Sequence, residues 1–152
     1  MTIAQRTATT VWEGPLAEGA GLVHAASGAF SPLPVTWAGR THQPGGQTSP
    51  EELAAAAHSS CFAMALALCL DNHGAGAQRL DVAATVTLDQ VDATPTIVSS
   101  ALRVRATVEG LAPTDFKAVV DEAATLCPVS RLFAGARVTV DADLDTPAGG
   151  VS

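Results

Sequence analysis

The chain has 152 residues and a mass of 15.3 kDa; 47% of the residues are hydrophobic, 15% are charged, and the formal net charge is −7. This length and apolar content predict one domain with a core of its own and exclude a disordered chain. The negative charge disfavours nucleic acid and anionic membranes as partners. We expect a single domain over residues 1–144, followed by a frayed tail at residues 145–152 that is rich in Gly, Pro and Ser.

Three short strands and a loop are predicted in the first third of the chain. Two of the strands, Thr7–Glu13 and Gly21–Ala26, are expected to flank a turn at Gly14-Pro15. A weaker third strand is expected over Leu33–Gly39. The segment Thr41–Ser49 contains one proline and two adjacent glycines, which predicts a loop.

A long helix is predicted to follow this loop. Ser49 is a good N-cap, Pro50 suits the first helical position, and Glu52 completes a capping box. The helix is expected to run to about Leu70 and to stop near Asn72–Gly74. Its interior is apolar but rich in alanine, with a histidine and two serines in the middle. We therefore predict a buried helix of a soluble protein rather than a membrane span.

Two alternating segments come next. Apolar and polar residues alternate along Arg79–Val91 and again along Thr96–Glu109, which predicts two half-buried strands. An antiparallel pair that turns near Asp92–Pro95 is the simplest arrangement.

The last third of the chain predicts a second helix, a break and a final strand. Apolar residues recur at helical spacing after Pro113, and Cys127-Pro128 interrupts the pattern. A further helical turn, Val129–Phe133, and a strand, Arg137–Leu144, complete the order βββ-α-ββ-α-β. This order predicts the α+β class, with antiparallel-rich sheets packed around the long central helix.

The three cysteines are expected to be free thiols of a cytoplasmic protein, since their number is odd and residues 1–10 contain no apolar leader. Cys69 has apolar neighbours and is interpreted as a packing residue. Cys61 lies one turn after His58, and it fits either a small buried hydrophobe or a reactive thiol. Cys127 begins a helical turn, where backbone N–H groups and the helix dipole favour a thiolate.

A metal site is not expected. The pair formed by His58 and Cys61 supplies two ligands at close spacing, but a zinc site needs four. The other histidines and Cys127 form no second close pair in the sequence, so we predict neither a metal nor another cofactor.

Two motifs, in this order along the chain, resemble the OsmC/Ohr family of organic hydroperoxide reductases. The first motif covers Ser49–Leu53 and Ala57–Leu66, and the second is Cys127–Ser130. The order of predicted elements is similar to that family over nearly the whole chain. Trp12–Gly14 and Arg40 resemble the OsmC branch in particular.

The resemblance implies a role for each of four residues. Cys61 matches the peroxidatic cysteine and Cys127 the resolving cysteine, while Arg40 matches the active-site arginine and Glu51 the carboxylate that pairs with it. The implied activity is an antioxidant, thiol-dependent peroxidase that reduces organic hydroperoxides to alcohols. It would proceed through a sulfenic acid and a Cys61–Cys127 disulfide, which an external dithiol, lipoyl-type by resemblance, would reduce. A guanidinium held by a carboxylate would supply the charge that lowers the pKa of a buried thiol.

The spacing of these residues predicts a homodimer. Glu51 and Cys61 are separated by ten residues, or about 15 Å along a straight helix, so they cannot share a site within one chain. Two antiparallel copies of the helix about a two-fold axis would bring Glu51 of one chain beside Cys61 of the other. The many alanines of this helix would allow the close approach. We therefore expect an intertwined homodimer with two interfacial sites.

Two other functions remain open at this stage. One is a non-enzymatic module that binds a small apolar ligand and has structural cysteines, and the other is a thiol sensor whose Cys61–Cys127 disulfide acts as a signal. Candidate walls of an apolar pocket, each equally suited to core packing, are Trp37, Phe62, Met64 and Phe133.

Overall fold

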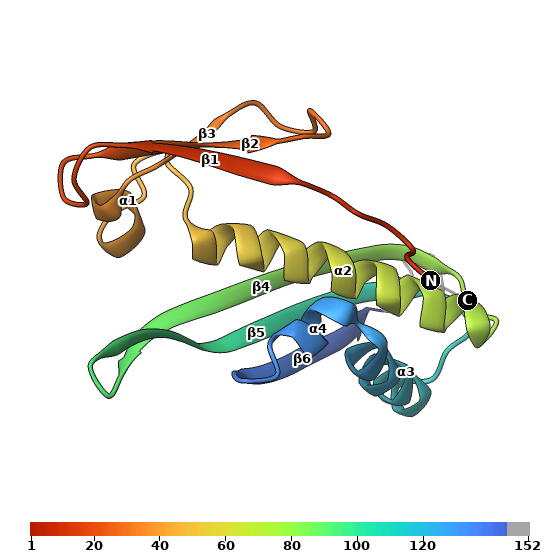
Figure 1. The fold of residues 1–152 in the computed structure, drawn as a ribbon. Coiled ribbons are helices and arrows are strands. Elements are labelled where there is room, and N and C mark those ends of the chain that lie inside the picture. The colour runs from red at the N-terminus through yellow and green to blue at the C-terminus, as the bar shows by residue number, and fades with distance from the viewer. Residues whose placement is uncertain (146–152) are drawn as a thin grey trace. The chain divides into compact units, whose positions relative to one another are not determined.

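The computed structural model describes residues 1–145, which form two three-stranded sheets and four helices (Figure 1). This mixture of sheets and helices is the α+β class that the sequence predicts. The chain divides into two compact units, Met1–Leu53 and the part that begins at Ala54. The predicted tail at 146–152 lies outside the described residues.

The first unit contains the β1-β2-β3 sheet, in which both strand pairs are antiparallel. Strands β1 (Ala8–Glu13) and β2 (Ala20–Ala25) lie within one residue of their predicted bounds. Strand β3 (Leu33–Val35) is shorter than predicted, because a short helix, α1 (Trp37–Thr41), replaces its second half. The prediction of a strand up to Gly39 was therefore wrong.

Side-chain hydrogen bonds explain why α1 forms. Thr36 has an extended backbone, and its Oγ1 accepts a hydrogen bond from the Gly39 N–H at 3.0 Å, which caps the helix. Gly39 leaves room for the Gln47 side chain, which would have to shift if a Cβ atom were present at this position. The cap places Arg40 in the last turn of α1.

The long helix α2 (Pro50–Asn72) starts at the predicted residue. Ser49 Oγ accepts a hydrogen bond from the Glu52 N–H at 3.1 Å, which confirms one half of the capping box. The other half differs, because the Glu52 carboxylate accepts from the Thr48 hydroxyl at 2.8 Å. The helix ends within the predicted interval, and Gly74 after it has a left-handed backbone with φ +71°.

The second unit contains the β4-β5-β6 sheet. Strands β4 (Ala77–Val91) and β5 (Thr94–Val108) form the predicted antiparallel hairpin. Strand β6 (Arg137–Asp145) pairs with β5 in the parallel direction. Asp145 belongs to this strand and pairs with Thr107, so the predicted tail was one residue too long at its start.

Two residues at the tip of the β4-β5 hairpin have left-handed backbones. Asp92 has φ 48° and Ala93 has φ 63°, the signs that a two-residue type I′ turn requires. An aspartate tolerates this conformation better than an alanine does, because the alanine Cβ approaches the following carbonyl oxygen.

Replacing Ala93 with glycine is expected to raise the free energy of unfolding by about 1 kcal/mol, because glycine has no Cβ to strain the left-handed backbone. Urea denaturation would measure the change. Ala83→Gly is the matched control: Ala83 is an exposed residue within strand β4, where the same change is expected to destabilise. Equal loss of stability in both variants would contradict the prediction.

The core of the second unit lies on one face of its sheet. Helices α2 and α3 (Pro113–Leu126) contribute buried side chains to this core together with β5. The fully or nearly buried apolar residues of β5 are Leu102, Val104, Ala106 and Val108, which the alternating pattern predicts for one face. A fourth helix, α4 (Pro128–Leu132), begins immediately after Cys127.

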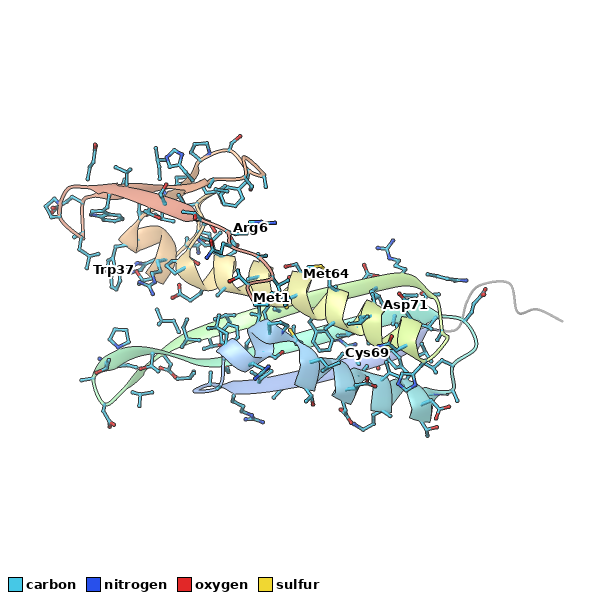
Figure 2. The ribbon with its side chains drawn as sticks, turned by 45° about the vertical axis from the view of Figure 1, so that its right-hand side comes forward. Met1, Arg6, Trp37, Met64, Cys69 and Asp71 are labelled. Atoms are coloured by element: carbon cyan, nitrogen blue, oxygen red, sulfur yellow. The ribbon has the colours of Figure 1, made fainter. Side chains whose placement is uncertain are left out.

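Helix α2 has one buried side and one exposed side in this unit. Cys69 is 0% exposed and Met64 on the other side is 68% exposed (Figure 2). Among residues 1–145, α2 is the one helix whose length and composition would suffice to cross a membrane. Its Phe62, Leu66 and Leu70 side chains are fully buried in the core.

Candidate functional site

Arg40 and Glu51 form an ion pair in the first unit. The Arg40 Nη2 lies 2.6 Å from Glu51 Oε1, and its Nε donates to both carboxylate oxygens at 3.1 Å. The Glu51 side chain is 11% exposed, whereas 30% of the Arg40 side chain is exposed. The hydrogen bonds to Glu51 raise the pKa of Arg40, with burial opposing and the carboxylate charge adding to this effect. The pair therefore holds a permanent positive charge in one orientation.

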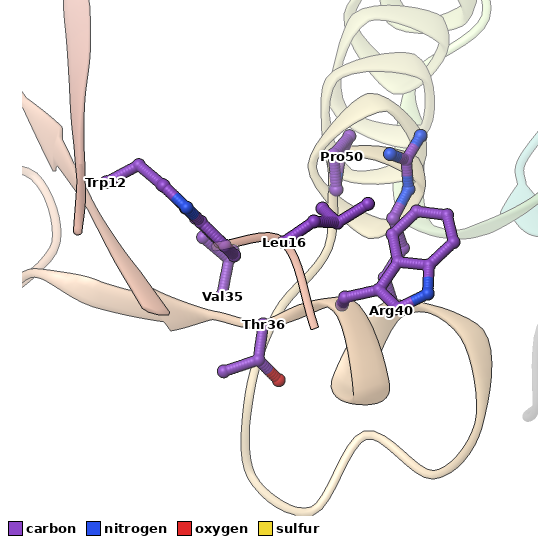
Figure 3. Close-up of a pocket in the computed structure, with 7 residues that line it drawn as sticks. Trp12, Leu16, Val35, Thr36, Arg40 and Pro50 are labelled. Atoms are coloured by element: carbon purple, nitrogen blue, oxygen red, sulfur yellow. The ribbon is translucent and has the colours of Figure 1, made fainter. Parts of the chain in front are cut away.

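An apolar pocket of about 390 Å³ lies next to this guanidinium (Figure 3). The guanidinium carbon of Arg40 is 5.9 Å from the centre of the Trp37 ring, within the range of a cation–π contact. Both residues line the pocket, and the other lining residues are Trp12, Leu16, Val35, Thr36 and Pro50. The pocket thus combines apolar walls with one cation, a composition that suits a small molecule with an apolar body and a polar end.

Cys61 and Cys127 lie together in the second unit, and both are free thiols. The Cys61 thiol donates a hydrogen bond to the Cys127 sulfur. Cys127 is 0% exposed, while Cys61 is partly exposed. At the start of α4 the backbone N–H of Val129 donates to both sulfurs, which is the type of contact that the Cys-Pro break predicts for Cys127.

The two sulfurs differ in acidity. Burial raises the pKa of Cys61, and its hydrogen bond to Cys127 and the charge there add to the rise, so the Val129 N–H is outweighed. Burial also raises the pKa of Cys127, but hydrogen bonds from the Ser130 hydroxyl and N–H, from Cys61 and from Val129 reverse the effect and lower it. Within the second unit, Cys127 is therefore the more acidic of the two thiols.

Two serines near the cysteines were not singled out from the sequence. Ser100 on β5 is fully buried and hydrogen bonds to His58, which also contacts Ser130. A signal for Ser100 was present, because it is a polar residue on the apolar face of an alternating strand. Ser130 follows Cys127 by three residues, but its contact with a histidine 72 residues away has no local signature.

The remaining candidates have other surroundings. Cys69 is fully buried in the apolar core, as expected of a packing residue. Burial raises the pKa of its thiol, and the charge of Glu122 and a hydrogen bond to it act in the same direction. Of the candidate pocket walls, Trp37 lines the pocket beside Arg40, whereas Phe62 belongs to the core and Met64 is exposed. Phe133 packs against the His58 ring at 5.0 Å between centroids.

Comparison with known proteins shows clear relatives. The chain is 38% identical over 133 residues to the peroxiredoxin OsmC of Escherichia coli (strain K12), covering 88% of this chain and 92% of that protein. It is 31% identical over 106 residues to the organic hydroperoxide resistance protein-like 2 of Staphylococcus epidermidis, covering 70% of this chain and 72% of that protein.

Solved structures show the same fold. The crystal structure of an organic hydroperoxide resistance protein OsmC from Legionella pneumophila has a TM-score of 0.70 and 21% identity, with 95% of this chain and 99% of that chain covered. The organic hydroperoxide resistance protein OhrB of Bacillus subtilis has a TM-score of 0.66 and 20% identity, with coverage of 91% and 98%. The profile of the OsmC-like protein family matches residues 43–143. Together with the 38% identity over most of the chain, this match shows that the chain belongs to the OsmC-like family.

Proposed function

We propose that this protein is a cysteine-based peroxidase that reduces organic hydroperoxides to alcohols. Its relatives named peroxiredoxin OsmC and organic hydroperoxide resistance protein support a peroxide-related redox role. The single observation that carries the cysteine mechanism is the hydrogen bond between the free thiols of Cys61 and Cys127. Two neighbouring free thiols are the groups from which thiol–disulfide chemistry forms an intramolecular disulfide.

In the first step, the Cys61 thiolate attacks the distal oxygen of the hydroperoxide. The O–O bond breaks, the distal oxygen and its proton stay on Cys61 as a sulfenic acid, and the alkoxide leaves and takes up a proton to become an alcohol. Sulfur is oxidised by two electrons and the peroxide is reduced by two. Cys61 is partly exposed, which is consistent with access for the peroxide.

In the second step, the Cys127 sulfur attacks Cys61. The S–S bond forms, the S–O bond of the sulfenic acid breaks, and the hydroxide leaves as water with the proton that Cys127 gave up. An external dithiol then reduces the disulfide by thiol–disulfide exchange and restores both thiols. This sequence assigns Cys127 as the resolving cysteine.

The pocket beside Arg40 supports an organic substrate rather than hydrogen peroxide. Its walls are apolar, and Arg40 offers hydrogen-bond donors and a positive charge at one edge. An alkyl or aryl group gains free energy by leaving water for such walls, whereas hydrogen peroxide has no apolar surface to bury.

The homodimer remains a prediction and is part of this proposal. Within the second unit, Cys61 has hydrogen bonds with the Val129 N–H and with Cys127. Neither of these groups is a cation. A peroxidatic thiolate needs a positive charge beside it. In a two-fold dimer, with α2 antiparallel to its copy, Arg40 and Glu51 of one chain would supply it to Cys61 of the other.

Replacement of Cys127 by serine tests the proposed cycle. With cumene hydroperoxide and a dithiol, wild type is expected to turn over repeatedly, and Cys127→Ser is expected to lose at least about tenfold in steady-state rate because the disulfide cannot close. The Cys61 sulfenic acid should then accumulate and be trapped by dimedone, as mass spectrometry would show. Wild type that consumes no peroxide with any dithiol would contradict the enzyme proposal, and a disulfide that forms once but is never turned over would favour the sensor.

A further inference from the structure

His58 is a buried histidine whose two ring nitrogens both have side-chain partners. It lies on α2, one turn before Cys61, and is 0% exposed. Its Nδ1 is 2.6 Å from Ser100 Oγ on β5, and its Nε2 is 2.8 Å from Ser130 Oγ on α4. The Ser130 hydroxyl in turn donates to the Cys127 sulfur. Three consecutive hydrogen bonds thus connect Ser100 to Cys127.

Counting protons gives the direction of each of these three hydrogen bonds. Ser130 has one hydroxyl proton, which it gives to Cys127, so its oxygen must accept a proton from His58 Nε2. Burial lowers the pKa of His58, which keeps the ring neutral with a single N–H. Nδ1 is therefore the acceptor, and Ser100 donates to it. In all three hydrogen bonds the donor therefore lies on the Ser100 side and the acceptor on the Cys127 side.

Packing alone does not explain a histidine at this position. The Phe133 ring lies over the imidazole, with 5.0 Å between centroids and planes tilted by 30°, a contact that a phenylalanine could also make. A buried imidazole is costly unless both nitrogens are satisfied, which here requires one serine from β5 and one from α4. The titratable side chains in the network are His58 and Cys61 from α2 and Cys127 at the start of α4, and β5 contributes the neutral Ser100.

We propose that His58 is a positioning residue for the resolving step, acting through Ser130 to stabilise the Cys127 thiolate that closes the disulfide on oxidised Cys61. This inference rests on the proposed peroxidase cycle. Without the imidazole N–H, the Ser130 hydroxyl is free to rotate away from Cys127, and the thiolate loses its side-chain donor. The proton that Cys127 gives up leaves with the sulfenic hydroxyl as water, so His58 is neither oxidised nor permanently protonated.

Fast closure has a chemical benefit. A sulfenic acid that waits for its partner can react with a second peroxide and form a sulfinic acid, which most thiols cannot reduce. A resolving sulfur with a lowered pKa shortens this wait, because a larger fraction of it is thiolate, the nucleophilic form. Variants of His58 are therefore expected to be inactivated at lower peroxide concentrations than wild type.

The test is a single-turnover experiment on the full-length protein. Reduced protein is mixed with one equivalent of cumene hydroperoxide, and disulfide closure competes with trapping of the sulfenic acid by dimedone. His58→Phe is expected to slow closure about tenfold, the scale of one lost hydrogen bond to a charged group. Ser130→Ala should slow it equally, and the double variant should be no slower than either single variant. Phe133→Leu, which changes only the packing on the imidazole, is the control and is expected to change closure less than twofold.

A second readout separates this role from a structural one. In the Cys61→Ser background, the absorbance of the Cys127 thiolate against pH should show its pKa raised by about one unit in His58→Phe. His58→Gln, whose amide nitrogen can donate to Ser130 from nearly the position of Nε2, should restore most of the shift. If His58→Phe does not fold, Ser130→Ala and His58→Gln make the same comparison.

Three results would overturn the inference: unchanged closure in folded His58→Phe, additive effects of His58→Phe and Ser130→Ala, or closure in Ser130→Ala as fast as in wild type. Failure of the proposed function has a different signature, namely wild type that consumes no peroxide while the Cys127 titration still responds to His58. Peroxide consumption with normal closure in the His58 variants would sink this inference alone.

Discussion

Replacing Cys61 with serine is expected to abolish peroxide reduction, with a loss of at least about 10⁴-fold in kcat/KM. A serine hydroxyl is a far poorer nucleophile than a thiolate and remains protonated at neutral pH, so the O–O bond is not attacked. Consumption of cumene hydroperoxide in the presence of a dithiol measures the effect. Mass spectrometry of the treated variant should show no sulfenic acid and no disulfide.

Cys69→Ala is the matched control for this prediction. Cys69 lies on the same helix eight residues later, is fully buried, and hydrogen bonds to Glu122 rather than to another cysteine. The variant should lose some stability but retain peroxide reduction once folded. Activity that survives Cys61→Ser, or that is lost in Cys69→Ala while the protein stays folded, would contradict the assignment of Cys61.

Replacing Arg40 with methionine is expected to lower kcat/KM about 100-fold, because the thiolate and the charge that develops on the leaving oxygen lose their cation. Without that cation the pKa of the attacking thiol rises, so the pH–rate profile should shift toward higher pH. Arg40→Lys should recover part of the rate, since it retains a charge but not the two-pronged contact with Glu51. Stopped-flow measurement of sulfenic acid formation against pH tests both effects.

Arg103→Met is the control for the loss of one arginine. Arg103 lies on the exposed face of the second sheet, where it pairs with Asp141 at 2.9 Å and Asp143 at 2.7 Å. Exposed pairs of this kind contribute little to stability. An Arg40→Met protein with wild-type kinetics, or an equal loss in Arg103→Met, would remove Arg40 from the proposed mechanism.

Mixing variants tests the proposed shared site. If Arg40 of one chain serves Cys61 of its partner, then Arg40→Met chains are strongly impaired and Cys61→Ser chains inactive on their own, but activity returns when the two are refolded together. The mixed dimer contains one site with both wild-type residues, so about half of the activity per mixed dimer should return. Light scattering on the same samples would give the assembly state, and a fully active monomer would refute the dimer.

Elements with local signals could be predicted from the sequence alone. The start of α2 follows from Ser49, whose hydroxyl caps the Glu52 N–H, and from proline at the first helical position. Strands β4 and β5 follow from alternation over 15 residues each, since one face is buried and the other is not. The break at Cys127 follows from the proline after it.

Elements that depend on distant contacts could not be predicted in this way. The helix α1 was missed because the Thr36 hydroxyl caps Gly39 and Gln47 packs over that glycine, in a segment too short to show a period. The parallel pairing of β6 with β5 joins strands that two helices separate. Alternation shows that a strand has a buried face but does not identify its neighbour.

The sequence by itself determined the α+β class, the order of the elements other than α1, and the two motifs that resemble a family of thiol peroxidases. Capping, alternation and proline breaks are local effects of the chain, so they can be recognised without knowledge of the fold. Only the tertiary structure decided that Cys61 contacts Cys127, that Arg40 is held by Glu51, and that His58 connects Ser100 to Ser130 across 42 and 72 residues of sequence. Such contacts arise when helices pack on a sheet, and packing depends on the shape and hydrogen bonding of the whole core rather than on any single segment.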